Sequence, residues 1–174
     1  MKKGFTLVEL MVVISILLIL SGIALPRFMN AMVKAKIARA QGDLRTLGHA
    51  LENYRTHYPE YPKSIFADLG DMEIELGIFA TLPALTTPNR FLSTLPKDPF
   101  TGGNYQYFST LINEKATLPF QKIYGEWIIL STGPDKDINL NGITGRLIHY
   151  APTNGILSDG DLVRSQRETL YERN

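Results

Sequence analysis

The sequence predicts an α+β protein in which one long N-terminal helix, embedded in a membrane over its first half, packs on a small antiparallel β-sheet. Three observations predict this class. The chain begins with an apolar run, continues with apolar residues at helical spacing, and ends in short segments rich in aromatic and β-branched residues. Its 174 residues suffice for one ordinary domain but not comfortably for two.

The first element is an apolar run from Phe5 to Leu25, in which Glu9 is the only charged residue. Helical residues rise about 1.5 Å each, so this run measures roughly 30 Å, the thickness of a bilayer's hydrocarbon core. A secretory signal would have a shorter apolar core, roughly 7–15 residues, followed by a small-x-small cleavage site. Length therefore predicts a transmembrane helix. Glu9 is unusual in it, because a carboxylate inside a membrane usually has a functional partner.

The helix is expected to continue beyond the membrane to about His57, roughly 80 Å in all. Apolar residues recur there at alternating steps of four and three, which places them on one helical face. They are Val33, Ile37, Ala40, Leu44, Leu47, Leu51, Tyr54 and Tyr58. Pro59 and Pro62 end the helix. Its apolar face needs a cover, which a sheet from the remaining chain would provide.

The remaining chain is expected to form a connecting region and then strands. Residues 59–95 are interpreted as connection, with a helical piece near Ile65–Leu76. Glycine-containing turns separate the expected strands, whose composition is typical of β-structure. These strands are Tyr105–Ser109, Tyr124–Leu130, Leu147–Tyr150 and Asp161–Arg164.

An acidic loop is the one candidate metal site. Asp135, Asp137, Asn139 and Asn141 alternate along the chain ahead of Gly142. Oxygen side chains at every second position are what a tight calcium loop requires. The second half of an EF-hand loop is missing, so other oxygens would complete the site, with Ser158, Asp159 and Asp161 as candidates. A polar hairpin turn without metal is the alternative interpretation.

Several classes of function are not favoured. A net charge of +1 argues against a nucleic-acid binder, and the absence of cysteine excludes disulfides and thiolate zinc sites. The histidines, at positions 49, 57 and 149, are scattered and are expected at the surface. No nucleophile motif is recognisable, so no enzyme is predicted. For Lys34, Lys36 and Arg39, a solvated helix face is favoured over contact with lipid headgroups or DNA.

The segment from Lys2 to Glu9 resembles the class III signal of type IV prepilins and type II secretion pseudopilins. The resemblance implies that a membrane prepilin peptidase cuts between Gly4 and Phe5 and methylates Phe5. Loss of Lys2 and Lys3 then changes the net charge from +1 to −1, with 16 basic and 17 acidic residues left. The new ammonium of Phe5 on one subunit and the Glu9 carboxylate of a neighbour can neutralise each other, because each charge alone would be disfavoured in lipid. Glu9 is thus expected to set the register of assembly.

A second resemblance favours one branch of this superfamily. The segment Asp98–Tyr107 is similar to the one that enters the sheet in the major pseudopilins of type II secretion. Those proteins lack the pilin disulfide and pin their C-terminal loop with calcium. The resemblance therefore implies calcium at the acidic loop, with Asp135, Asp137, Asn139, Asn141, Asp159 and Asp161 as ligands.

Together these features predict a leader at 1–4, a transmembrane half of the helix at 5–26, an amphipathic half at 27–58, and a sheet domain at 59–174. Gly22 and Pro26 predict either a kink or, as the resemblance implies, loss of helicity on packing. The expected function is that of a subunit of a helical filament, most simply the type II secretion pseudopilus. A type IV pilus subunit for adhesion, motility or DNA uptake and a singly anchored periplasmic binding domain are the alternatives.

The resemblance also implies where the chain acts and with what. Its implied partners are further copies of the chain, the prepilin peptidase, an inner-membrane platform, an assembly ATPase and an outer-membrane secretin. The expected location is the bacterial inner membrane, with one crossing and the C-terminal domain in the periplasm or outside the cell.

Overall fold

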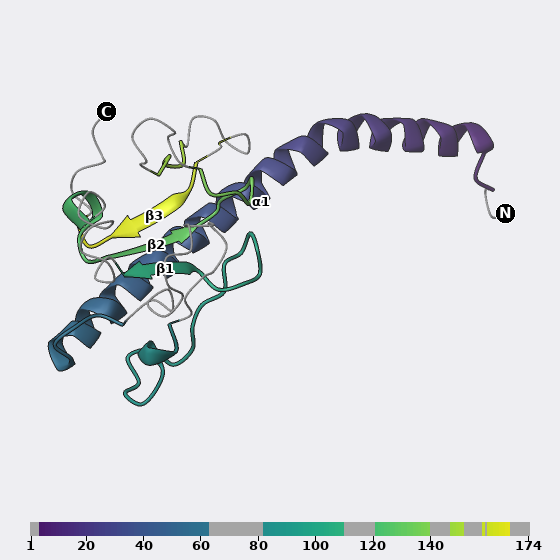
Figure 1. Cartoon of the computed structure of the whole chain (residues 1–174). Helices are drawn as coiled ribbons and strands as arrows, with labels where there is room; N and C mark the ends of the chain where they lie inside the picture. The colour runs from purple at the N-terminus through teal and green to yellow at the C-terminus, as the bar shows by residue number, and fades with distance from the viewer. Residues whose placement is uncertain are drawn as a thin grey trace.

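The computed structural model describes residues 4–62, 82–109, 121–139, 147–151, 158 and 160–167. A single long helix, α1 (Leu7–His57), runs out of a small domain. The strands β1 (Gln106–Ser109), β2 (Trp127–Ser131) and β3 (Leu162–Ser165) lie against its far half (Figure 1). The expected α+β class, with one N-terminal helix on a small antiparallel sheet, is confirmed. The expected helical piece near Ile65–Leu76 lies outside the described residues.

Helix α1 extends over Leu7–His57, close to the bounds expected from the sequence. Thr6 caps its first turn, and it ends at Tyr58, whose backbone N–H donates to the Tyr54 carbonyl at 3.0 Å. Pro59 cannot continue the helix, since it lacks the backbone donor. Arg55 and His57 lie in the last turn, where positive charge suits the helix dipole.

Helix α1 stays helical through Gly22 and Pro26 and curves along the part that leaves the domain (Figure 1). A proline inside a helix removes one hydrogen bond and bends the axis, which agrees with the kink interpretation for a single chain. Loss of helicity on packing concerns the assembled filament and stays a prediction.

The sheet has the order β1-β2-β3, with β1 at Gln106–Ser109, β2 at Trp127–Ser131 and β3 at Leu162–Ser165. Both pairings are antiparallel, with Tyr107 opposite Ile129 and Ile129 opposite Arg164. The central strand is buried along its whole length. Because strand side chains alternate, Trp127 and Ile129 join the cluster under α1, while Ile128 and Leu130 join a second cluster on the opposite face.

The main core is the face of α1 that the periodicity predicted. Its buried helix residues are Ile37, Ala40, Leu44, Leu47, Gly48, Ala50 and Leu51. Val33 and Tyr54 are partly buried against the same cluster. A short 3-10 helix, η2 at Pro83–Leu85, adds Leu85 to it, and Leu82, the residue before this helix, belongs to the same cluster.

Two expected strands differ from the prediction. Residues 121–124 are helical, and β2 begins only at Trp127. The reason is Gly125, which takes φ +88° and donates to the Gln121 carbonyl, so that it ends the helical turn. The expected strand Leu147–Tyr150 forms isolated bridges instead of a strand, one of them the parallel bridge between His149 and Asp161.

Candidate functional site

The N-terminal site is built by a capping box at the start of α1. Thr6 Oγ1 accepts from the Glu9 backbone N–H at 3.2 Å. Glu9 Oε2 accepts in return from the Thr6 backbone N–H at 3.0 Å and from the Thr6 hydroxyl at 2.7 Å. This reciprocal pair satisfies donors that every helix start leaves unpaired. It also holds the Glu9 carboxylate one turn from Phe5 and Gly4.

The two hydrogen bonds that Thr6 donates, from its backbone N–H and from its hydroxyl, both end on Oε2 of Glu9. Among the described residues, none donates to Oε1 in a bond of its own, so this oxygen can receive a donor from outside the chain. Thr6 was not singled out from the sequence, although the signal was present: Thr6-Leu7-Val8-Glu9 before an apolar run is a capping-box pattern.

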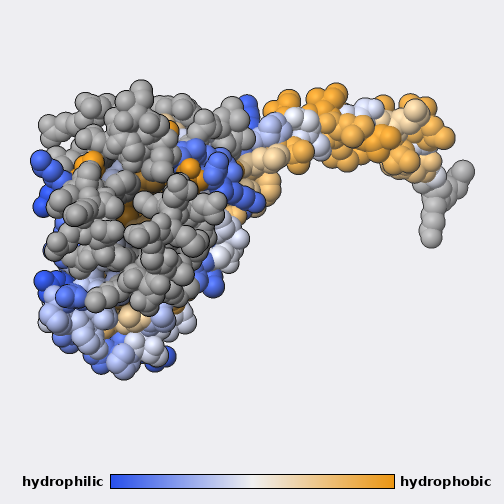
Figure 2. Space-filling view, viewed as in Figure 1, coloured by the Kyte–Doolittle hydropathy of each residue, from blue (hydrophilic) through white to orange (hydrophobic). Residues whose placement is uncertain are grey.

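The part of α1 that follows the capping box is exposed, and no described part of the domain packs against it. Figure 2 shows it as a hydrophobic arm projecting from a more polar domain. Large apolar side chains are exposed from Phe5 to Met32, among them Phe5 at 72% and Leu18 at 71%. Among the described residues, α1 is the one helix long and apolar enough to cross a membrane, and none of its most apolar window is buried. So much apolar surface is not stable in water, and it requires lipid or other helices as its surroundings.

The acidic loop lies against two other segments of the chain. A Cβ on Gly133 would meet the Gly160 carbonyl oxygen at 2.9 Å, and one on Gly160 would meet His149. Backbone bonds join Ile148 to Asn139 and Asp161 to both Ile148 and Tyr150. This close approach brings Asp161 beside a loop that precedes it by more than twenty residues. That Asp161 completes a metal site there stays a prediction.

Hydrogen bonds connect the expected ligands of this loop. Asn139 donates its side-chain amide to Asp135 Oδ2 at 2.7 Å and its backbone N–H to Asp161 Oδ2 at 3.0 Å. Asp135 and Asp137 are exposed, whereas Asp161 is 1% exposed. Ser158 is buried and accepts from the Ala151 backbone N–H. Asn141 and Asp159 lie outside the described residues.

Asp161 is the anomalous group in this arrangement. Its Oδ1 is buried and has no hydrogen-bond partner in the described structure. Burial, followed by the negative charges of Asp135 and Asp137, raises the pKa of Asp161 to about 7, although the hydrogen bond from Asn139 opposes the shift. A buried carboxylate oxygen without a donor is costly. Hard cations such as calcium bind this kind of oxygen.

No group of three or more carboxylate or histidine side chains positioned to hold a metal occurs in the part of the chain that the structure describes. A calcium site here would therefore include amide, hydroxyl or carbonyl oxygens, which calcium accepts readily. The side chains of His49, His57 and His149 are exposed, as expected.

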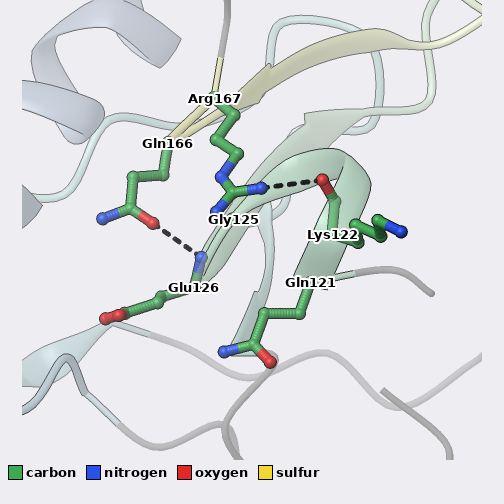
Figure 3. A pocket seen from close by; sticks show the side chains of 6 residues that line it. All are labelled: Gln121, Lys122, Gly125, Glu126, Gln166 and Arg167. Carbon is green, nitrogen blue, oxygen red and sulfur yellow. Dashed lines mark hydrogen bonds between the residues drawn. The ribbon is translucent and has the colours of Figure 1, made fainter. Parts of the chain in front are cut away.

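A pocket of about 500 Å³ lies at the end of β3 (Figure 3). Its polar groups bind one another: Gln166 Oε1 accepts from the Glu126 backbone N–H at 2.7 Å, and Arg167 Nη1 donates to the Lys122 carbonyl at 2.9 Å. Figure 3 shows both side chains turned toward these partners. These bonds tie the end of β3 to the helical turn at 121–124.

The same tie extends to α1. Gln166 Nε2 donates to the Tyr61 hydroxyl at 3.1 Å, and this hydroxyl donates to the Glu52 carboxylate at 3.0 Å. Trp127 Nε1 donates to the same carboxylate at 3.0 Å. In a chain without cysteine, this network holds the end of β3 to the long helix.

Comparison with known proteins adds two findings. Residues 1–25 match the family model described as the prokaryotic N-terminal methylation motif. Curated relatives named type II secretion system core protein G are similar over most of their length. The one from Vibrio cholerae is 35% identical over 62% of this chain and 71% of the relative. The one from Pseudomonas aeruginosa is 31% identical over 62% and 74%. The one from Escherichia coli K12 is 29% identical over 79% and 85%.

Proposed function

Because this chain belongs to the family of type II secretion system core protein G, we propose that it is the structural subunit of a type II secretion pseudopilus. The apolar half of α1 anchors the subunit in the inner membrane before assembly. After assembly the same surface forms the core of a helical filament, with the sheet domain outside. Growth of the filament supports protein secretion.

The observation that carries this proposal is the contrast within α1. The helix buries seven residues against the sheet in its second half and is exposed through its first half. An arm of this length has lipid as its environment in the monomer and other copies of the arm in the filament. The hydrophobic methylation motif at residues 1–25 supports the same use of this segment.

We propose that assembly begins when a prepilin peptidase cuts between Gly4 and Phe5 and methylates Phe5. The cut removes Lys2 and Lys3 and creates an ammonium group next to Thr6. Glu9 Oε1 accepts a hydrogen bond from the ammonium group of Phe5 on a neighbouring subunit, while Oε2 keeps its hydrogen bonds from Thr6 of its own chain. An ion pair formed between subunits fixes their axial register, because an unpaired charge in the filament core is strongly disfavoured. The inner-membrane platform, the assembly ATPase and the secretin are the partners that this route requires.

Replacement of Glu9 tests the proposal. Glu9→Leu removes the carboxylate while the helix stays apolar, so the subunit should insert and fold but yield no ordered filaments. Val8→Leu, the matched control one residue away, should assemble as the parent does. The measurement is filament yield by electron microscopy beside the membrane-bound amount of subunit. Normal filaments from Glu9→Leu would contradict the role proposed for the Glu9 carboxylate, whereas an absence of filaments from the parent chain as well would support a singly anchored domain that does not polymerise.

We further propose that the acidic loop binds calcium through Asp135, Asp137, Asn139, Asn141, Asp159 and Asp161. The support is the buried Asp161 Oδ1, which has no donor among the described residues, and the two carboxylates whose charge raises its pKa. When bound, the ion would supply the positive charge that this cluster lacks. Asn139 would hold Asp135 and Asp161 in place through its two hydrogen bonds.

Chelation tests the calcium proposal. At free calcium a hundredfold above Kd, an ion bound only by the folded chain adds about 2.7 kcal/mol of stability. The melting temperature of the domain, followed by the fluorescence of Trp127, should therefore fall on addition of EGTA and recover with calcium but not magnesium. Asp135→Ala/Asp137→Ala should remove this response, and Glu126→Ala, which deletes an acid elsewhere, should keep it. An unchanged melting temperature in EGTA would indicate that the loop is an ordinary polar turn that binds no calcium.

A further inference from the structure

The charges on α1 are segregated along the chain. Residues 10–42 contain four cations and no carboxylate, while residues 43–174 contain 12 basic and 16 acidic residues. The four cations form what we call the basic collar: Arg27, Lys34, Lys36 and Arg39. All four are exposed, and they lie where the bare arm meets the packed half of the helix.

The collar surrounds the exposed side of the helix. At about 100° of rotation per residue, Arg27 and Lys34 share one side, Arg39 lies about 120° further round, and Lys36 about 180°. The remaining side carries the core residues that begin with Ile37.

Two of the cations have partners within the domain and two have none in the described structure. Arg39 Nε is 3.7 Å from Asp43 Oδ2, and Lys36 Nζ lies 5.9 Å from the centre of the Phe100 ring. Arg27 and Lys34 form no ion pair with any described residue. An exposed positive charge of this kind is available to an anionic surface.

Exposed apolar side chains lie next to the basic collar along α1. Phe28, Met29 and Met32 are 63%, 57% and 49% exposed, although they follow the run that already spans the hydrocarbon core. An upright helix would carry Lys34 roughly 14 Å beyond Leu25, past a headgroup layer that is roughly 5–7 Å thick. Helix α1 curves where it leaves the domain (Figure 1), and a helix that enters the bilayer at a tilt keeps this segment near the interface. There its apolar residues enter the acyl boundary and its cations meet the headgroups.

We propose that residues 27–39 of the membrane-anchored subunit bind the headgroups of anionic phospholipids in the leaflet that faces the domain. The inference rests on the anchored state in the proposed function and adds a ligand to it. Charge complementarity selects an anionic lipid, because the segment combines four cations with no carboxylate. If this segment were a solvated helix face, as the sequence predicts, Phe28, Met29 and Met32 would be exposed to water. At the membrane interface, lipid covers these three side chains. Assembly would remove the subunit from these lipids, so the collar favours the stored monomer.

The test uses the full chain reconstituted in phosphatidylcholine vesicles with traces of spin-labelled lipid. Electron spin resonance then measures how strongly labelled phosphatidylglycerol associates with the protein relative to labelled phosphatidylcholine. A basic residue near an anionic surface contributes about 1 kcal/mol, or roughly fivefold. We expect at least a fivefold preference for phosphatidylglycerol, which weakens in 0.5 M salt.

Two triple variants carry equal changes in charge. Arg27→Gln/Lys34→Gln/Lys36→Gln should reduce the preference to less than twofold. Arg45→Gln/Arg90→Gln/Lys122→Gln, which changes three exposed cations outside the collar, should leave it unchanged. Resistance to alkaline extraction in both variants shows that insertion itself is intact, so a failure here is distinct from a failure of the proposed function.

Three outcomes would overturn the proposal. They are the absence of a preference for phosphatidylglycerol in the parent chain, an equal loss in the control variant, and an unchanged preference in the collar variant. The collar variant could also lose its filaments while its lipid preference stays unchanged. That result would indicate that the basic collar binds acidic residues of a neighbouring subunit instead of lipid.

Discussion

The first half of α1, to Met32, is exposed along its whole length, whereas the second half buries seven residues against the sheet and the segments beside it. Both halves are continuous helix, and both are rich in apolar residues. They differ in what covers those residues: the domain covers them in the second half, and no described part of the chain covers them in the first, where the proposed function places lipid or other subunits. The comparison separates two kinds of substitution, those that change folding of the domain and those that change only insertion or assembly.

The largest effect on stability is expected from truncation in the packed half. Leu51 is fully buried under the sheet, so Leu51→Ala leaves a cavity and should lower the free energy of unfolding by about 2–5 kcal/mol. Leu20→Ala makes the same change where the side chain is 58% exposed, and it should leave the unfolding of the domain unchanged. Chemical denaturation followed by the fluorescence of Trp127 measures both. An equal loss of unfolding free energy in the two variants would show that both halves of α1 contribute to the folding of the domain.

Two glycines of α1, Gly48 and Gly42, differ in the space around them. A Cβ on Gly48 would lie 2.8 Å from Arg164 Nε and 3.1 Å from Trp127 Cη2, because the sheet approaches the helix closely there. Gly48→Ala should therefore cost about 1–3 kcal/mol through overpacking.

Gly42 is the matched position, since a Cβ there meets nothing within 4 Å. Gly42→Ala should raise stability by up to about 1 kcal/mol, because alanine is the better helix former. The pair should move the melting temperature in opposite directions in calorimetry. A stabilising Gly48→Ala would show that the contact between α1 and the sheet is looser than described.

The smallest effect concerns the hydrogen bonds that tie the end of β3 to α1. Tyr61→Phe removes the hydroxyl that connects the exposed side chains of Glu52 and Gln166. It should cost about 0.5–1 kcal/mol, within the usual net range for a hydrogen bond whose partners can bind water instead. Tyr58→Phe removes a hydroxyl that accepts from Asn89 at an exposed site, and it should be nearly neutral. Urea midpoints distinguish the two, and equal midpoints would mean that the tie contributes nothing measurable.

The long helix could be predicted from sequence because its signals are local. The apolar run, the spacing of its core residues and the stop at Pro59 are read within a few turns of chain, and the structure agrees with each. Glu9 could be singled out in the same way, as a charge where none is expected. Thr6 carries an equally local signal, the capping-box spacing of residues 6 and 9, which the sequence prediction did not include.

The tie between α1 and β3 could not be predicted in this way. Its partners are 75 residues apart for Trp127 and Glu52 and 105 for Gln166 and Tyr61. Nothing in the local pattern relates such residues, and they meet only once the sheet has packed on the helix. The helical turn before β2 was missed for another reason. Its aromatic and β-branched residues favour a strand, but Gly125 ends a turn there with its positive φ.

The most direct test of the central claim is the mass of the N-terminal peptide from sheared surface material and from membranes. We expect a methylated peptide that begins at Phe5 and is confined to membranes, as a short periplasmic pseudopilus requires. The same peptide in the sheared fraction would favour a surface pilus. A chain that still begins at Met1 or Lys2, or one cut well after Leu25, would contradict the account.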